Sequence, residues 1–315
     1  MRLDKRFPVV VLVLLSAVLL SSCKSNHRSG ASRATGWKYN DENYGGFEVV
    51  EGYKPETAPG LKFIEGGTFI MGRTEQDVVY DWNNVPRRVT VSSFYIDETE
   101  CTNVEYREYL FWVRRVYGDK LIDVYDKALP DTLVWRSPMA FNEPFVRNYF
   151  RHPAYNDHPV VGVSWRQVVD YAHWRTNRVN ESILEKDGYI QQGSRYQVDA
   201  ESTFSTDTYL NTPENSYGRK VSEFAGKKAT NKDGNVTYAK QTEGILLPEY
   251  RLPTEVEWEY AAKSLNGIRE YNSIRGRKKY PWAGRYTRNG KRAEMGNQMA
   301  NFKQGQGDYG GLAGW

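Results

Sequence analysis

Short apolar runs that alternate with polar positions begin near residue 61. Leu61 to Ile64 and Thr68 to Gly72 lie on either side of a glycine pair, and Arg88 to Ser92 and Phe94 to Asp97 form a second set. A period of two residues, interrupted by glycine turns, is typical of β-strands. The sequence therefore predicts four short strands in two successive pairs.

Three later positions share the signature of a helix start, a Ser or Thr followed three residues on by Glu or Gln. The hydroxyl can accept a hydrogen bond from the backbone N–H three residues on, while the Glu or Gln accepts one from the N–H of the cap residue. Apolar residues then recur at helical spacing, which predicts a helix after each cap. The pairs are Thr102 and Glu105, Ser164 and Gln167, and Thr254 and Glu257.

Residues 176–249 show no sustained period. They are rich in Gly, Ser, Thr and Asn, with scattered Tyr. A loop of this length inside a compact domain is unusual. Three interpretations therefore stay open: an inserted lobe, a binding surface or a disordered segment.

The first residues have the features of a bacterial export signal. Three basic residues precede an apolar run from Val9 to Leu20, which is too short for a bilayer span of about 20 residues. The run ends in Leu20-Ser21-Ser22-Cys23, a lipobox. We expect a signal peptide over residues 1–22 and lipid on the Cys23 thiol, with ordinary cleavage or an uncleaved anchor as the alternative. Residues 23–60 are polar and bury too little to offset their ordering entropy, so they are expected to form a flexible tether.

The charge and the cysteine count of the chain exclude some classes of protein. The net charge is +4 at pH 7 and no long basic run occurs, so we expect no nucleic-acid partner. Of the two cysteines, only Cys101 stays free when Cys23 is acylated, which excludes an intrachain disulfide. Cys101 directly precedes the Thr102 cap and is expected to pack on Tyr106 as a small apolar residue.

Several motifs also occur in the order seen in one family. On them the chain resembles the formylglycine-generating-enzyme (sulfatase-modifying factor) family. The resemblance implies an α+β, loop-rich, C-type-lectin-like variant fold over residues 61–315, with residues 176–249 as an insertion. The closing strands of the family have no counterpart, so the domain is expected to be truncated at its C-terminus. The motifs are Gly66 to Gly72 (the opening hairpin of the family), Pro86 to Asn103, His158 to Trp165 and Arg251 to Ala262.

The resemblance also implies which chemistry is expected. The enzymes hold copper(I) with two cysteines, since soft thiolates suit that ion, whereas this chain offers Cys101 alone. We therefore expect a non-catalytic relative without a resident cofactor. The stretch from Ala300 to Gly305 is similar to a calcium-binding stretch of the enzymes. It implies a partial calcium site in the full-length protein, with the Asn301 side chain and the Phe302 carbonyl as ligands.

Within the family the chain is similar to gliding-motility-associated lipoproteins, which combine a lipobox, a polar tether and this domain. That similarity implies a non-enzymatic scaffold of gliding motility and type IX protein secretion, anchored by lipid in the outer membrane and facing the periplasm. It implies the gliding proteins GldK and GldN as partners. The alternatives are a copper-dependent formylglycine-generating oxidase and a glycan-binding, lectin-like module.

Overall fold

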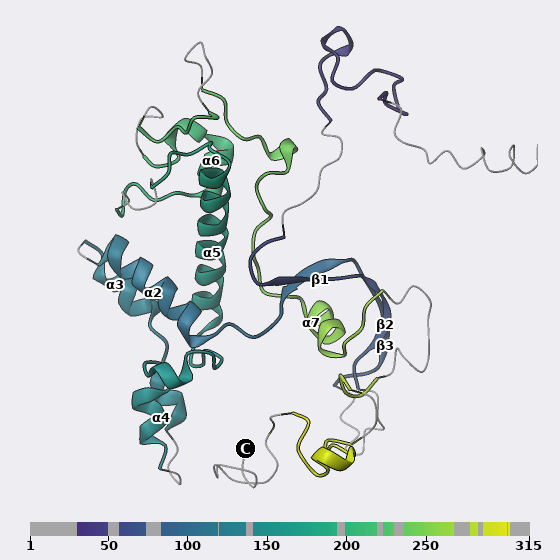
Figure 1. The fold of residues 1–315 in the computed structure, drawn as a ribbon, viewed down its shortest axis with the longest axis vertical. Coiled ribbons are helices and arrows are strands. Elements are labelled where there is room, and N and C mark those ends of the chain that lie inside the picture. The colour runs from purple at the N-terminus through teal and green to yellow at the C-terminus, as the bar shows by residue number, and fades with distance from the viewer. Residues whose placement is uncertain are drawn as a thin grey trace, which may run out of the picture. The chain divides into compact units, whose positions relative to one another are not determined.

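Two compact units make up the chain in the computed structural model (Figure 1). One unit comprises Met1–Lys54 with Thr242–Gly244, and the other comprises Pro55–Gln241 with Ile245–Trp315. The predicted signal peptide and Cys23 lie outside the described residues and stay predictions. The described residues are 30–49, 57–73, 83–118, 120–136, 141–193, 199–218, 223–229, 236–267, 278–282, 286–300 and 302.

Local hydrogen bonds order residues 30–49 in the first unit. A short 3₁₀ helix, η1 (Glu42–Tyr44), is capped by Asp41, whose side chain accepts a hydrogen bond from the Asn43 backbone N–H. The Asn40 amide pairs with the backbone of Val49, donating to its carbonyl at 2.9 Å and accepting from its N–H at 2.7 Å. These contacts form a small turn within the segment predicted to be a tether.

In the second unit, the four predicted strands are present as β1 (Leu61–Ile64), β2 (Gly67–Met71), β3 (Arg87–Val91) and β4 (Phe94–Asp97). Their pairing is nested: β1 pairs with β4 and β2 with β3, both antiparallel. The expected opening hairpin of β1 and β2 is therefore wrong.

The two pairs share one register. Ile64 lies opposite Phe94 and Gly67 lies opposite Val91, so the strands form one two-stranded ribbon that is interrupted between them. Gly66 passes so close to the opposite strand that an added Cβ would lie 2.3 Å from the Val91 carbonyl oxygen. A glycine is required here for close approach, not for a tight turn between β1 and β2.

The three predicted helices begin at the predicted caps. They are α2 (Asn103–Tyr117), α5 (Trp165–Lys186) and α7 (Glu255–Ala262), and each starts with a complete capping box. The backbone N–H of Thr102, Ser164 and Thr254 donates to the side chain three residues on, at 2.7–2.8 Å. Such a cap stabilises a helix by about 1 kcal/mol. No helix within the described ranges is long and apolar enough to cross a bilayer.

Shorter helices that the hydrophobic periodicity did not predict fill the connections. They are α3 (Ile122–Ala128), α4 (Glu143–Asn148), α6 (Thr206–Asn211) and the 3₁₀ helices η2 (Thr132–Trp135), η3 (Pro153–Tyr155), η5 (Pro213–Asn215), η7 (Gln241–Glu243) and η8 (Arg292–Glu294).

Aromatic side chains form much of the buried core. Between α2, α3 and α5, Tyr106 stacks on Tyr171 with ring centroids 5.7 Å apart, and its hydroxyl donates to the Ala128 carbonyl at 2.8 Å. Under α7, the Tyr260 ring meets Phe69 of β2 edge to face at 5.2 Å. Burial of a tyrosine is favourable here because both the ring and the hydroxyl find partners.

The segment predicted to be irregular contains a long stretch of helix and a lobe with its own core. Helix α5 continues to Lys186, although residues 176–249 show no sustained hydrophobic period. The hydrophobic pattern did not predict this part of the helix, because polar residues of α5 face the lobe. The Asn180 side-chain amide, for example, accepts a hydrogen bond from the Leu247 N–H at 2.8 Å and donates one to the Leu247 carbonyl at 3.1 Å. The lobe core contains Leu184, Tyr189, Ile190, Phe204, Tyr209, Tyr217, Phe224, Ala229, Ala239 and Leu246.

A buried carboxylate fastens the lobe to α5. Glu181 is 2% exposed. It accepts hydrogen bonds from Arg178 at 2.6 Å and from the Tyr217 hydroxyl at 2.5 Å. Of the three interpretations of this segment, the described residues favour the inserted lobe.

Candidate functional site

The free cysteine lies in the core between α2 and α5. Cys101 packs against the cluster that contains Tyr106 and Tyr171, as the sequence predicted. Burial raises the pKa of its thiol to about 11, although a hydrogen bond from the Tyr171 hydroxyl to the sulfur offsets part of this effect. At neutral pH the group is therefore a protonated thiol. The deprotonated thiolate is the form that attacks substrates and binds metals.

The surroundings of Cys101 do not fit copper(I). That ion prefers thiolate ligands, but the groups around the sulfur are tyrosine rings, the Thr102 carbonyl and the ion pair of Arg175 with Asp97. The other cysteine of the sequence, Cys23, lies outside the described residues. Within the described ranges, no cluster of three or more His, Cys, Asp or Glu side chains is arranged to hold a metal ion.

A two-pronged ion pair beside this core joins the ribbon to α5, and sequence reasoning missed it. The two terminal nitrogens of Arg175 donate to the two oxygens of Asp97 at 2.7 and 2.8 Å, and one of them also donates to the Pro59 carbonyl at 3.0 Å. The guanidinium lies 4.5 Å from the centre of the Tyr250 ring. Burial lowers the pKa of Arg175, but the hydrogen bonds and charge of Asp97 outweigh this and raise it overall.

The acidic residues at the start of α7 have separate structural roles. Glu257 completes the capping box of Thr254 and accepts hydrogen bonds from both terminal nitrogens of Arg251. Glu259 accepts from the Gly72 N–H at 2.9 Å and pairs with Lys263 at 2.6 Å. Glu255 is exposed and lies 4.0 Å from Arg87. Glu257 thus caps the helix, Glu259 is held in a largely buried ion pair and Glu255 lies at the surface. Arg251 also lies at the surface.

His158 and His173 belong to no group of three or more His, Cys, Asp or Glu side chains that could hold a metal ion among the described residues. The His158 ring meets the Tyr155 ring edge to face at 5.3 Å. The His173 Nδ1 lies 2.7 Å from a Glu249 oxygen on an exposed face of α5. For the predicted calcium site, Asn301 lies outside the described residues and Phe302 is partly exposed. That site stays a prediction.

A groove of about 450 Å³ lies between α2, α3 and α5. Trp112, Trp174 and Arg178 are among the residues that line it. The indole Nε1 of each tryptophan and the Nε of Arg178 are shielded from solvent and have no acceptor. An unsatisfied buried donor costs about 1–3 kcal/mol. Figure 1 shows α3 beside α2, and α2 beside α5. Sequence reasoning did not anticipate the groove.

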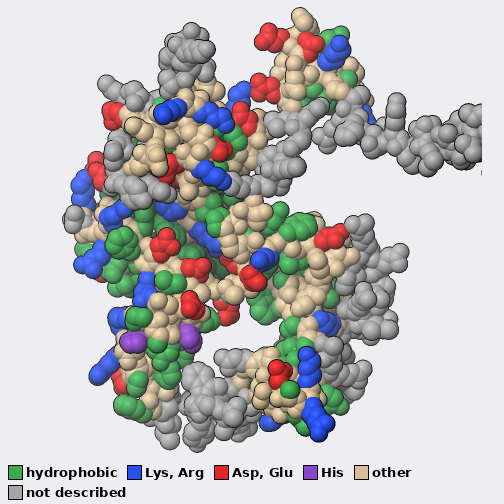
Figure 2. Space-filling view, viewed as in Figure 1, with side chains coloured by type: hydrophobic (Ala, Val, Ile, Leu, Met, Phe, Trp, Pro, Cys, Tyr) green, Lys and Arg blue, Asp and Glu red, His purple; other side chains and the backbone are tan. Residues whose placement is uncertain are grey.

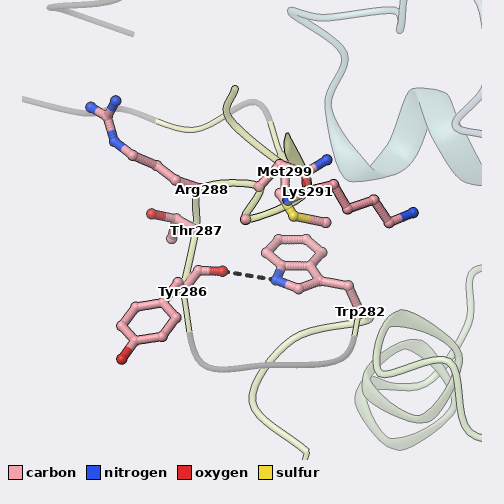
Figure 3. Close-up of a pocket in the computed structure, with 8 residues that line it drawn as sticks. Trp282, Tyr286, Thr287, Arg288, Lys291 and Met299 are labelled. Carbon is pink, nitrogen blue, oxygen red and sulfur yellow. Dashed lines mark hydrogen bonds between the residues drawn. The ribbon is translucent and has the colours of Figure 1, made fainter. Parts of the chain in front are cut away.

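A second, larger hollow of about 850 Å³ lies in the loops of residues 282 and 286–299. Figure 3 shows the Trp282 ring beside Met299 and Lys291, with its indole N–H bonded to the Tyr286 carbonyl at 2.9 Å. The Trp282 donor is thus already satisfied, unlike the two indoles of the groove. Elsewhere on the visible face, Figure 2 shows acidic and basic side chains interspersed among the described residues.

The sequence match shows the family to which the chain belongs. Residues 46–311 match the family described as Sulfatase-modifying factor enzyme 1-like domain, so the chain belongs to this family. Its described residues combine helices and strands with long connections, as an α+β, loop-rich fold requires.

The similarity to characterised relatives is low. The chain is 27% identical over 178 residues to the formylglycine-generating enzymes of Mus musculus and Bos taurus. The matched region covers 50% of this chain, 47% of the mouse enzyme and 46% of the bovine enzyme. The chain therefore spans about half the length of the curated relatives it matches.

Proposed function

We propose that this chain is a non-catalytic member of the family that acts as a lipid-anchored scaffold, similar to the gliding-motility lipoprotein GldJ. The observation that carries the proposal is the state of Cys101. Its sulfur is a protonated core group with a pKa of about 11, hydrogen-bonded to Tyr171 and surrounded by aromatic rings. A residue in this setting contributes packing, whereas the reaction of the enzymes requires accessible thiolates.

The proposed location rests on the N-terminal sequence. The lipobox that ends at Cys23 supports acylation of that thiol, and acylation would anchor the protein in the outer membrane, facing the periplasm. The polar segment of residues 23–60 would let the domain stand away from the lipid. The domain itself, residues 61–315, is proposed to be the C-type-lectin-like variant of the family fold.

The proposed partners are other proteins of gliding motility and type IX secretion, such as GldK and GldN, and no nucleic acid. The lobe carried by α5 supports this role. Its buried aromatic and aliphatic residues form a core of their own, and a preorganised surface loses less entropy on binding than a loose loop.

Crosslinking and pull-down of the lipidated full-length protein test the partners. Deleting residues 176–249 is unsuitable, because it would cut α5 and uncover Leu184, which is fully buried. Charge reversal on the lobe surface, with Asp207→Lys and Glu214→Lys, is expected to weaken capture of GldK or GldN. Reversal of the exposed Glu255 on α7 is the matched control. Equal capture by both variants and by the unmodified protein would remove the lobe from the interface.

The catalytic status is tested with the full-length protein and a cysteine-containing peptide. We expect no copper-dependent oxidation of the peptide. We also expect the Cys101→Ala variant to behave as the unmodified protein does in this assay. Copper-dependent turnover that the Cys101→Ala variant loses would overturn the proposal in favour of a formylglycine-generating oxidase.

A further inference from the structure

The loop of residues 286–299 folds back on itself as a short hairpin. Arg288 and Gln298 pair as an antiparallel bridge, and N–H to carbonyl hydrogen bonds flank this bridge on both sides. The flanking bonds run from Met299 to Thr287 at 2.9 Å and from Asn289 to Asn297 at 2.8 Å. The helical turn η8 lies between the two arms of the hairpin. The tip of the loop is therefore held by hydrogen bonds within the loop itself.

The loop is basic, and neighbouring carboxylates do not neutralise it. Arg288, Lys291 and Arg292 are exposed, and none of them forms an ion pair with a carboxylate in the part of the chain that the structure describes. Glu294 is the one acidic residue in this stretch of sequence, and its carboxylate accepts a hydrogen bond from the Asn289 amide at 2.6 Å. Figure 2 shows Lys and Arg side chains prominent on this segment, which Figure 1 draws in yellow.

Large apolar side chains are exposed on the same loop. Tyr286 is 79% exposed, Met295 is 69% exposed and Met299 is 37% exposed. Single exposed apolar residues are common on protein surfaces, but here three of them lie on one short loop among basic residues. Removing such side chains from water is favourable in proportion to the apolar area covered. The loop thus combines positive charge with apolar surface.

The basic side chains are spread along the loop. Figure 3 shows Arg288 and Lys291 pointing in different directions from the backbone, at the hollow that Trp282 and Met299 also line. Their charges do not converge on one point, as they would in a site for a single phosphate or carboxylate ion. This arrangement fits an extended surface that carries many negative charges.

We propose that this loop docks on an anionic lipid surface, with Lys291 and Arg292 at the phosphate headgroups and Met295 among the upper parts of the acyl chains. Exposed basic residues are attracted to anionic lipid at short range. Their long side chains can reach the headgroups while apolar neighbours are buried. A soluble polyanion, such as a nucleic acid or an acidic polysaccharide, would satisfy the charges but leave the methionines in water.

The inference rests on the proposed function for its setting, because a lipid on Cys23 would keep the loop close to a membrane. The docking itself does not require that lipid. Residues 23–60 are proposed to be a flexible tether, which lets the domain move towards the membrane as well as away from it. Contact through the loop would hold the domain at the surface and restrict its orientation.

Vesicle co-sedimentation of the full chain with Cys23→Ser tests the loop without the lipid anchor. The vesicles contain equal parts of phosphatidylglycerol and phosphatidylcholine, and vesicles of phosphatidylcholine alone are the neutral control. Combining Lys291→Gln with Arg292→Gln should weaken binding to the anionic vesicles about thirtyfold, because each basic residue near the surface contributes about fivefold. Lys227→Gln with Lys228→Gln is the matched control, since these exposed residues are also adjacent and carry the same charge. The N-terminal segment is identical in all variants, so it does not cause a difference between them.

Insertion of the tip is measured separately with the environment-sensitive fluorophore NBD. It is attached through Met295→Cys in the Cys23→Ser chain, where Cys101 packs in the core and labels slowly. The emission should shift to the blue on anionic vesicles and stay unchanged with dextran sulfate, a soluble polyanion. The same label at Asp207→Cys, an exposed position of the lobe, should not shift. Met295→Ser should weaken vesicle binding about three- to tenfold and leave dextran sulfate binding unchanged.

Three results would overturn the proposal. The first is equal binding of the Cys23→Ser chain to anionic and neutral vesicles. The second is an equal loss of binding in the two double variants, which would show that the loop is not the contact site. The third is charge-dependent binding without an emission shift at position 295, which would assign the loop to a soluble polyanion. Loss of the lipidated protein from membranes, with vesicle binding of the Cys23→Ser chain retained, would refute the proposed lipid anchor and support the proposal for the loop.

Discussion

Arg251 and Glu257 form a two-pronged ion pair at the start of α7, with nitrogen to oxygen distances of 2.9 and 2.7 Å. The same Glu257 carboxylate accepts from the backbone N–H of Thr254 at 2.8 Å and so closes the capping box. One side chain thus joins the preceding loop to the first turn of the helix. The Tyr260 ring on this helix packs on β2, so the cap also determines how α7 meets the ribbon.

This arrangement predicts a dependence of stability on acidic pH. The hydrogen bonds from Arg251, together with those from Thr254, lower the pKa of Glu257 from 4.5 to about 2 in the folded protein. The folded state therefore binds the proton less readily than the unfolded state. The stabilisation is fully present above pH 4.5 and is lost as the pH falls towards 2.

Urea unfolding at pH 7 and pH 3 checks this prediction. Glu257→Gln is expected to lower the free energy of unfolding by about 1–2 kcal/mol at pH 7 and by less at pH 3. Glu255→Gln, at a carboxylate 75% exposed, should change it little at either pH. An equal loss for Glu257→Gln at both pH values would show that the charge does not contribute.

The buried hydrogen bonds of Glu181 predict that replacing this residue strongly destabilises the lobe. Glu181→Ala leaves the Arg178 charge and the Tyr217 hydroxyl in the core without this acceptor, and breaking a buried ion pair costs about 3–5 kcal/mol. Tyr217→Phe removes one hydrogen bond and should cost about 1 kcal/mol. Limited proteolysis measures the effect: cleavage within residues 199–218 should increase slightly in Tyr217→Phe and much more in Glu181→Ala. Identical cleavage of both variants and the unmodified protein would contradict a fastening role.

The burial of Cys101 predicts that its thiol reacts slowly with alkylating reagents. Because burial raises the pKa of the thiol to about 11, iodoacetamide should label it at pH 7.5 only after the protein is unfolded. Tyr171→Phe removes a hydrogen bond that lowers the pKa of the thiol, so it should not create a reactive thiolate unless it also opens the core. Mass spectrometry of a Cys23→Ser chain measures the label. Fast labelling of the folded chain would contradict the assignment of Cys101 to the core.

The Arg175 and Asp97 ion pair predicts energetic coupling between α5 and the ribbon. Arg175 is 17% exposed and meets Asp97 through two hydrogen bonds. A double-mutant cycle of Arg175→Met and Asp97→Asn should give a coupling energy of about 1–3 kcal/mol in thermal or urea unfolding. The exposed pair of Lys62 and Glu98 at 3.1 Å is the control and should couple by less than about 1 kcal/mol. An equal coupling energy in both pairs would show that the Arg175 and Asp97 ion pair does not join α5 to the ribbon more strongly than an exposed pair would.

Local patterns were sufficient for the elements whose cause is local. The caps at Thr102, Ser164 and Thr254 depend on side chains three residues away, and the strands depend on alternation over four or five residues. The position of Cys101 was predictable for the same reason, because it directly precedes a cap. The continuation of α5 was missed, since Asn180 and Glu181 read as a solvated face until the lobe that covers them is known.

The sequence by itself determined where the four strands and the three capped helices begin, and which family motifs the chain carries. Only the tertiary structure decided that β1 pairs with β4, that Glu181 is buried and that the Trp112 and Trp174 indoles share a groove. The physical reason is the range of the interactions. Capping and alternation act between neighbours in the chain, whereas strand pairing, burial of a charge and the formation of a groove between helices depend on residues far apart in sequence.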